Sequence, residues 1–247
     1  AAPPPAGVVT QSAFLELRII QDYSSQVLED SAVRGRLVIG LYGKDAPKTV
    51  GHFLRFVRPR EDGSGPSYGS GLFYSNQEGR YLEGGRINGL FPTEVPGVGR
   101  VYQWLGQAVG LEPVLEASPL RHGRRWLLSH NRFNPGPEFA VTLGPAPELD
   151  AGWTVFGEVL SGGELIDTMA ELPYVTGKSL DPEGSLADNI WRAQNSYFFG
   201  LAKQLGDTRV TNKFPGKLLR RVEIVSCGTG SGPAPAPAPG AQAQARK

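Results

Sequence analysis

The stretch from Phe73 to Gly85, which reads FYSNQEGRYLEGG, decides the fold because the flanking patterns are arranged around it. A strand pattern and an amphipathic helix pattern precede it, and the segments LLSHN, PEFAVTL and ELDAGWTVFGEV follow it. Within it, Phe73 to Asn76 and Tyr81 to Glu83 predict two short strands, and Gly84-Gly85 predicts a turn. A phenylalanine eleven residues before a Gly-Gly pair, in this order of segments, is the main signal in the sequence.

The composition favours a chain of many short strands. The sequence has 247 residues with 33 Gly and 21 Pro, and no linker interrupts its middle, so one large β-rich domain is expected. The formal net charge of +1 gives no electrostatic reason to expect nucleic-acid binding. No run of about 18 apolar residues occurs, so no transmembrane helix is expected. The single cysteine, Cys227, cannot form a disulfide within the chain.

Hydrophobic periodicity predicts further elements on both sides of the central stretch. Alternation in Phe14 to Ile20 predicts a half-buried strand. Asp45 is the predicted N-cap of a helix from Pro47 to Val57, whose apolar residues recur at helical spacing. Other segments also fit strands or a short helix. Gly89 to Pro119 has Gly and Pro at irregular spacing and is predicted to be a long excursion. The strand candidates are Gly35 to Gly43, Arg125 to Ser129, Phe139 to Leu143, Thr154 to Leu160 and Leu218 to Cys227, and the second helix is Gly163 to Leu172.

The ends of the chain and one internal segment differ from the rest. Residues 1–8 are Pro-rich and residues 229–247 carry an Ala-Pro repeat, so both are predicted to be disordered around a domain of residues 9–228. A helical insertion at about residues 174–216 contains an amphipathic helix from Ser185 to Gly206. The chain begins Ala-Ala-Pro without methionine, as it would after leader removal or after trimming, and both explanations stay open.

The central stretch resembles the FHRxxxxFMxQGG segment of cyclophilins, the peptidyl-prolyl cis-trans isomerases. PEFAV resembles the family's SQFFI, and ELDAGWTVFG resembles its WLDGKHVVFG. The resemblance covers roughly Arg36 to Gly228. It implies an all-β fold, a cyclophilin-like eight-stranded antiparallel barrel with capping helices, to which the helical insertion is an addition.

The resemblance also shows that most of the family's groove residues are replaced. Ser75 stands at the position of the catalytic arginine. Asn131 and Leu149 are the two groove residues that match the family, and we assign no catalytic residue. The other replacements bring charge or change size: Arg80 and Tyr81 for Phe-Met, Glu83 and Glu138 for two glutamines, Ala140 for the pocket-floor phenylalanine, Glu148 for tryptophan and Trp153 for histidine.

These replacements bear directly on catalysis. An X-Pro bond isomerises across a barrier of about 18–20 kcal/mol, and the family is understood to lower it with an apolar proline pocket and an arginine that donates to the prolyl nitrogen. Loss of such a donor typically costs about 10²–10³ in rate. We therefore expect weak or absent isomerase activity. An alternative is that Arg80 swings back to replace the missing arginine.

Other candidate sites are weaker. Gly65 to Gly69 fits G-x-S-x-G, but it lies in a Gly-rich loop and not between a strand and a helix. His52 is expected to be solvated. His130 is expected to border the groove, and a hydrogen bond to a loop carbonyl is favoured over a catalytic role. His122 adds to a basic run with Arg121, Arg124 and Arg125, which fits a solvated turn or a contact with an acidic partner. The histidine spacing matches no metal motif, so neither a metal nor a cofactor is expected.

Two functional classes follow from the resemblance. One is a non-catalytic or barely catalytic protein that binds protein or peptide segments, as an assembly or scaffold factor for a photosynthetic complex. The other is an active peptidyl-prolyl isomerase that acts as a folding catalyst on X-Pro segments. Divergent plant and algal cyclophilins of the thylakoid lumen have a similar insertion and tend to lack the arginine, which implies that compartment. The charged groove residues predict poor binding of cyclosporin-type ligands.

Overall fold

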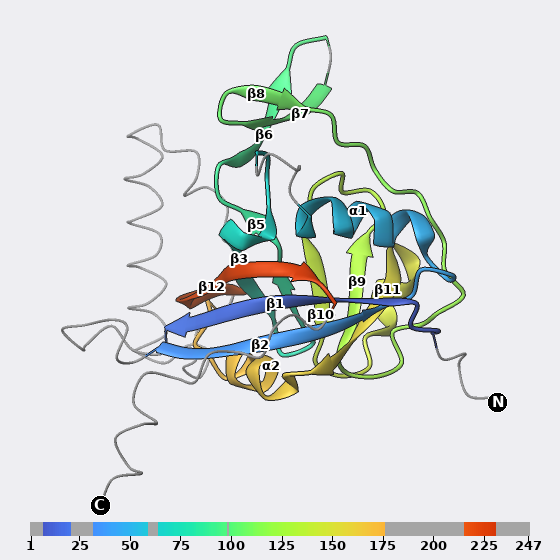
Figure 1. Ribbon diagram of the computed structural model, residues 1–247, viewed down its shortest axis with the longest axis vertical. Coiled ribbons are helices and arrows are strands. Elements are labelled where there is room, and N and C mark those ends of the chain that lie inside the picture. Colours follow the sequence, from blue (N-terminus) through green and yellow to red (C-terminus); the bar gives the residue numbers. More distant parts are fainter. Residues whose placement is uncertain (1–6, 21–31, 59–63, 98, 176–214, 231–247) are drawn as a thin grey trace, which may run out of the picture.

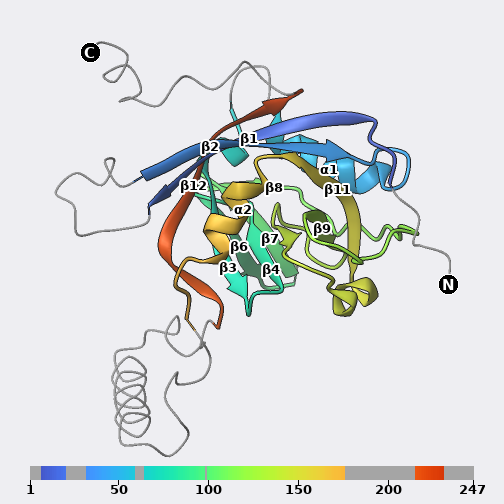
Figure 2. The same ribbon diagram turned by 90° about the horizontal axis from the view of Figure 1, so that it is seen from below.

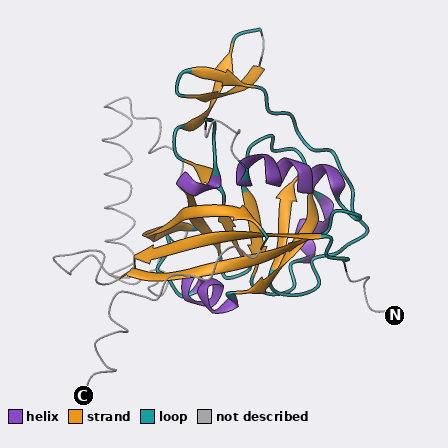
Figure 3. Cartoon of the chain, in the orientation of Figure 1, coloured by secondary structure: helices purple, strands orange, loops and turns teal. Residues whose placement is uncertain are grey.

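The computed structural model describes residues 7–20, 32–58, 64–97, 99–175 and 215–230, and strands are their main regular structure (Figure 3). Two α-helices and two short 3-10 helices accompany the strands within these ranges. The strands are β1 (Gln11–Ile20), β2 (Ala32–Leu41), β3 (Gly71–Gln77), β4 (Tyr81–Gly84), β5 (Arg86–Ile87), β6 (Leu90–Val95), β7 (Gly99–Trp104), β8 (Gln107–Val109), β9 (Leu127–Asn131), β10 (Phe139–Thr142), β11 (Trp153–Ser161) and β12 (Lys217–Thr229). The helices are α1 (Pro47–Val57), η2 (Tyr68–Ser70), η3 (Pro147–Ala151) and α2 (Gly163–Ala170).

Eight of the strands close into an antiparallel barrel. Their order is β12-β1-β2-β11-β9-β10-β4-β3, and β12 also pairs with β3, which joins the two ends of the sheet. The helices α1 and α2 lie at opposite sides of this barrel (Figures 1 and 2). The predicted eight-stranded barrel with capping helices is therefore confirmed.

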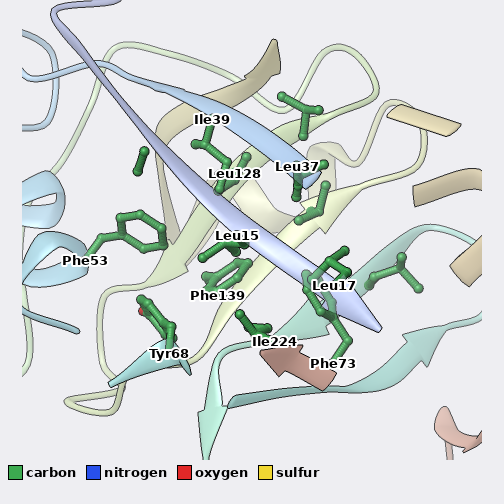
Figure 4. Packing of buried hydrophobic residues seen from close by; sticks show 14 of the residues in the cluster. Leu15, Leu17, Leu37, Ile39, Phe53, Tyr68, Phe73, Leu128, Phe139 and Ile224 are labelled. Atoms are coloured by element: carbon green, nitrogen blue, oxygen red, sulfur yellow. The ribbon is translucent and has the colours of Figure 1, made fainter. Parts of the chain in front are cut away.

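The barrel is filled by the side chains that the strand patterns predicted to point inward. Leu15, Leu17 and Ile19 alternate along β1 and are at most 1% exposed. Figure 4 shows Leu15 and Leu17 among side chains from other strands, with Phe139 near the centre. Phe53 of α1 packs on Tyr68 and Phe156 at ring-centroid distances of 5.1 and 5.2 Å. The apolar face of α1 thus closes one end of the barrel, as its spacing predicted.

The start of α1 differs from the prediction. The N-cap residue is Ala46, which makes no side-chain capping bond, and Asp45 instead accepts a hydrogen bond from the backbone N–H of Val8 (3.2 Å). The carboxylate of Glu116 accepts from the backbone N–H groups of Lys48 (3.0 Å) and Thr49 (2.8 Å). A distant loop therefore satisfies the helix terminus, a contact that local sequence could not show.

The predicted excursion from Gly89 to Pro119 contains three strands, which the sequence did not predict. β6, β7 and β8 form a separate antiparallel sheet that projects from the barrel (Figure 1). The turn between β7 and β8 has Leu105 at φ 49° and Gly106 at φ 81°. Leucine is unusual in the left-handed region, so the hairpin lacks the Asn-Gly or Asp-Gly signal that normally reveals one.

The described chain stops at Val175 and resumes at Pro215, and the residues on the two sides of this interval are hydrogen-bonded to each other. The backbone N–H of Val175 donates to the carbonyl of Lys217 (2.8 Å), and that of Gly216 donates to the carbonyl of Val175 (2.7 Å). The chain on either side of residues 176–214 is thus held together next to β12. The predicted helix from Ser185 to Gly206, the Pro-rich residues 1–6 and most of the Ala-Pro tail lie outside the described residues, so the domain limits stay predictions. None of the helices in the described ranges has the length and apolar character needed to cross a membrane.

Candidate functional site

Strand pairing brings the central stretch next to three other segments. Ser75 of β3 pairs with Glu83 of β4, Glu83 pairs with Ala140 of β10, and Ala140 pairs with Ser129 of β9. We call these four residues the cross-strand row. Directly paired residues have close Cβ atoms, so Glu83 and Ala140, which are 57 residues apart in sequence, become neighbours. The row therefore contains three of the positions at which the resemblance predicts groove residues, together with Ser129.

Ser75 is buried and its hydroxyl is engaged by a neighbouring amide. Ser75 is only 4% exposed. The Nε2 group of Gln77 donates both to Ser75 Oγ (2.9 Å) and to Glu83 Oε2 (2.8 Å). The position that the resemblance assigns to the arginine is thus occupied by a hydroxyl, a carboxamide and a carboxylate in hydrogen-bond contact.

Arg80 is directed away from Ser75 and toward the 3-10 helix η3. Its Nη1 lies 2.8 Å from Glu148 Oε1, with the Arg80 and Glu148 side chains 50% and 38% exposed. Next to this ion pair, the rings of Tyr81 and Trp153 lie 6.0 Å apart. An ion pair and two large rings therefore occupy the positions where the resemblance places the family's proline pocket.

The two residues that match the family's groove contacts are mostly engaged within the fold. Leu149 lies in η3 and is 3% exposed. Asn131 ends β9, and its Oδ1 accepts a hydrogen bond from the backbone N–H of Phe133 (3.0 Å). Asn131 also pairs with Trp153 of β11, which brings it beside the Tyr81 and Trp153 rings. The peptide-binding role of Asn131 and Leu149 stays a prediction.

Glu138 lies at the edge of this region in a partly buried polar group. Its Oε2 accepts from Asn134 Nδ2 (3.2 Å), and Asn134 Oδ1 accepts from the hydroxyl of Tyr102 (3.2 Å). Burial raises the pKa of the Glu138 carboxyl above its ordinary value, and the nearby Glu83 carboxylate acts in the same direction. Sequence reasoning found Glu138 but missed Asn134 and Tyr102, since their contact joins β7 to the loop before β10.

His130 and His52 form a ring contact beside Glu138. His130 is 3% exposed and its Nδ1 donates to the carbonyl of Glu138 (2.9 Å), as expected for a histidine bonded to a loop carbonyl. Burial, with a smaller contribution from the neighbouring His52, lowers the pKa of His130 to about 4. His52 is not simply solvated as predicted, because its ring lies 4.8 Å from His130 and its Nε2 bonds the carbonyl of Gly136 (2.9 Å).

The sequence placed His122 in a basic run and missed its actual contacts. His122 Nδ1 lies 2.6 Å from Asp150 Oδ1, and Nε2 lies 2.7 Å from Ser129 Oγ. This is the order of groups found in serine hydrolases, but Ser129 is 0% exposed and its hydroxyl is also within 3.3 Å of the Thr154 carbonyl. A substrate could not reach that hydroxyl. The chain of contacts instead ties η3 to β9 beneath the cross-strand row.

The remaining predicted features have ordinary structural roles. Ser67 of the G-x-S-x-G match caps η2 by accepting from the backbone N–H of Gly69 (3.2 Å). Arg124 pairs with Glu158 at 2.6 Å, and Arg125 pairs with Asp167. Over the described ranges, no three His, Cys, Asp or Glu side chains gather closely enough to hold a metal ion.

Comparison with known proteins identifies the family. A model of the family described as "Cyclophilin type peptidyl-prolyl cis-trans isomerase/CLD" matches residues 26–188, which is more than half of the chain. This chain belongs to the cyclophilin-type peptidyl-prolyl cis-trans isomerase family. The match ends before β12, although β12 is the strand that closes the barrel.

Three relatives illustrate the range of the similarity. The chain is 28% identical over 253 residues to "Peptidyl-prolyl cis-trans isomerase CYP28, chloroplastic" of Arabidopsis thaliana, covering 92% of this chain and 83% of that protein. It is 32% identical over 171 residues to peptidyl-prolyl cis-trans isomerase 9 of Caenorhabditis briggsae, covering 67% and 50%. It is 30% identical over 139 residues to peptidyl-prolyl cis-trans isomerase A of Mycobacterium tuberculosis (strain ATCC 25618 / H37Rv), covering 51% and 69%.

Proposed function

We propose that this cyclophilin binds protein segments and has weak or no isomerase activity. The observation that carries the proposal is the hydrogen-bonded group of Ser75, Gln77 and Glu83 at the position that the resemblance assigns to the catalytic arginine. A charged donor that acts on the twisted prolyl nitrogen would stabilise the transition state selectively. Ser75 is short and neutral, and its hydroxyl is already bonded to Gln77.

The neighbouring ion pair supports the same proposal. Arg80 is held by Glu148, so the alternative in which Arg80 replaces the missing arginine requires breaking a contact of 2.8 Å. Leaving a polar group unpaired against an apolar ring costs about 1–3 kcal/mol. A bare proline ring or a cyclosporin-type ligand is therefore a poor match for this surface, and a polar or charged peptide is a better one.

The cellular setting we propose is the chloroplast, with the thylakoid lumen as the compartment and a photosynthetic complex as the assembly that the protein serves. The chloroplast rests on the relative from Arabidopsis thaliana, whose name is chloroplastic and which aligns with 92% of this chain. The lumen and the photosynthetic complex rest on the resemblance of the insertion to that of lumenal cyclophilins. Capture of partners from thylakoid extracts, compared with stromal extracts, tests this setting.

A protease-coupled assay on a proline tetrapeptide tests the catalytic part of the proposal. We expect kcat/KM at least about 10²-fold below that of an ordinary cyclophilin measured in parallel, because one transition-state donor is missing. Arg80→Ala is expected to leave this low value unchanged, and Arg86→Ala, which removes the guanidinium nearest Tyr74, serves as the matched variant.

Turnover close to that of ordinary family members would establish the alternative, an active folding catalyst. If that turnover then fell in Arg80→Ala and not in Arg86→Ala, Arg80 would be the surrogate donor. Tight binding of cyclosporin by calorimetry would likewise contradict the proposed surface. Each of these outcomes is separate from whether the chain binds protein segments.

A further inference from the structure

The barrel has an opening between two of its paired strands, β3 and β12. Lys217 pairs with Ser75 and Val222 pairs with Phe73, and between these pairs β3 has only Tyr74, whereas β12 has the four residues from Leu218 to Arg221. Extra residues in one strand interrupt the ladder and bend that strand away from its partner. β3 and β12 are therefore paired at both ends of a short stretch in which they are not paired.

A cavity of about 620 Å³ lies at this opening. One side is formed by Leu72, Tyr74 and Arg86, and the other by Lys217, Leu219 and Arg220. We call it the seam cavity. Its volume falls within the range of about 300–1,000 Å³ that is usual for ligand sites, which is room for two or three side chains of a peptide. Ser75 and Glu83 also line it, so it is continuous with the cross-strand row.

The seam cavity concentrates positive charge in a chain whose formal net charge is only +1. Four basic residues line it, and the one carboxylate, Glu83, is bonded to Gln77. Arg221 pairs with Glu223 at 2.6 Å, and Arg220 contacts the carbonyl of Leu219 at 3.4 Å. Arg86 contacts the Tyr74 side chain and is attracted by the Glu138 carboxylate. The proposed site is built on Arg86 and Lys217, which lie on opposite sides of the cavity.

Arg86 and Lys217 are placed to meet an anionic group. The Cζ of Arg86 lies 3.7 Å from the centroid of the Tyr74 ring. A guanidinium stacked in this way presents N–H groups along its edge, and that edge matches the geometry of a carboxylate. Lys217 is exposed at the opposite strand and supplies a second positive charge. Leu219, which is 49% exposed, adds an apolar surface next to it.

We propose that the seam cavity is a binding site for an acidic segment of a partner protein. Carboxylates of the segment lie beside Arg86 and Lys217, and an adjoining aliphatic side chain contacts Leu219 and Leu72. The proposal takes from the proposed function only that the ligand is a peptide. It does not depend on the catalytic activity of the groove, because the cations that recognise the ligand are on β5 and β12.

Fluorescence anisotropy with the full chain tests this site. The probes are two labelled hexapeptides, Gly-Leu-Glu-Glu-Leu-Gly and its analogue with both glutamates replaced by glutamine. We expect the acidic peptide to bind about tenfold or more tightly than the analogue at low salt, and the difference to shrink at high salt. The double variant Arg86→Glu with Lys217→Glu is expected to abolish that preference.

A matched control uses a basic residue away from the cavity. Lys44→Glu changes the charge of the whole protein in the same direction at an exposed lysine before α1, and it should leave peptide binding unchanged. Lys217→Gln is a milder second variant, expected to weaken acidic-peptide binding about threefold to tenfold. Circular dichroism verifies that every variant is folded.

Several results would overturn the proposal. Equal affinity for the two peptides, or the same affinity in the double variant, would show that the cavity does not recognise carboxylates. Displacement of the peptide by polyphosphate at matched charge concentration would indicate a general anion surface. If analytical ultracentrifugation showed a dimer that only the double variant loses, the occupant of the cavity would be a second copy of the chain. The variant Tyr81→Ala alters the groove and leaves Arg86 and Lys217 in place. Binding of the acidic peptide that persists in this variant depends on the seam cavity and not on the groove, so the two proposals can fail separately.

Discussion

Phe139 and Ala140 are neighbours on β10 and belong to two different environments. Phe139 points into the barrel and meets Phe53, Tyr68 and Phe73 at ring-centroid distances of 5.5 to 5.7 Å. Ala140 lies in the cross-strand row between Glu83 and Ser129. The interior is thus filled by large apolar side chains, whereas the row and its surroundings contain small, polar and charged ones.

This difference shows how the apolar interior and the polar cross-strand row can change independently. Interior packing depends on volume and on the two-residue alternation of strands. The row and its surroundings are held by polar contacts, such as the hydrogen bond of Gln77 with Glu83 and the ion pair of Arg80 with Glu148. A chain can therefore keep the barrel of an isomerase while the chemistry of one of its faces is replaced. Three predictions test the contrast.

The largest effect is expected in the interior. Phe139→Ala removes a ring that is 1% exposed and in contact with three other rings, so it should lower the free energy of unfolding by about 3–5 kcal/mol. Urea unfolding followed by fluorescence measures the change. Phe133→Ala is the matched control, because Phe133 is 68% exposed and should cost less than about 0.5 kcal/mol. Similar losses for both variants would contradict the packing described here.

An intermediate effect is expected from pH. His130 has a pKa of about 4 in the folded chain, against about 6.5 when unfolded, so the unfolded chain binds the proton first. Stability should therefore fall as the pH drops from about 6.5 toward 4, by about 2–3 kcal/mol from this residue.

The variant His130→Gln isolates that contribution. Unfolding free energies at pH 7 and pH 5 should differ less in the variant than in the unaltered chain, because glutamine does not titrate. The comparison is needed because Glu138, whose pKa is raised by burial, acts in the opposite direction in the lower part of this range. An identical pH slope in both proteins would exclude a buried neutral His130.

The smallest effect is expected at the ion pair near the row. Arg80 and Glu148 are half-exposed, and such pairs contribute about 0–1 kcal/mol. A double-mutant cycle with Arg80→Ala and Glu148→Ala should give a coupling energy below about 1 kcal/mol that decreases with salt. A coupling of several kcal/mol would mean that the surface is as tightly determined as the interior, and the contrast would be lost.

Elements with a buried apolar face were predictable from the sequence, whereas contacts between distant segments were not. The alternation in Phe14 to Ile20 and the helical spacing of Val50, Phe53 and Val57 predicted β1 and α1, since burial of one face leaves a periodic signal. The sheet of β6 to β8 was missed because Leu105 replaces the usual turn residues at a positive φ. The cap of α1 was misassigned because its acceptor, Glu116, lies 67 residues beyond Thr49.

The candidate site shows more clearly which contacts local sequence patterns do not predict. The resemblance of FYSNQEGRYLEGG and PEFAV to family segments named Ser75, Glu83 and Glu138, but it did not reveal their hydrogen-bond partners. The Asp150, His122 and Ser129 contacts join η3 to β9, and no local pattern connects those residues. The opening between β3 and β12 depends on a mismatch in strand register, which is a property of two strands and not of either one.

The amino-acid sequence by itself determined the eight strands of the barrel, the first helix and the resemblance to the family, because side-chain periodicity and motif spacing are local. Only the tertiary structure decided that Gln77 meets Ser75, that Arg80 meets Glu148, and that Arg86 and Lys217 line one cavity. The physical reason is that hydrogen bonds and ion pairs act over a few ångströms, and closing the barrel brings distant segments within that range.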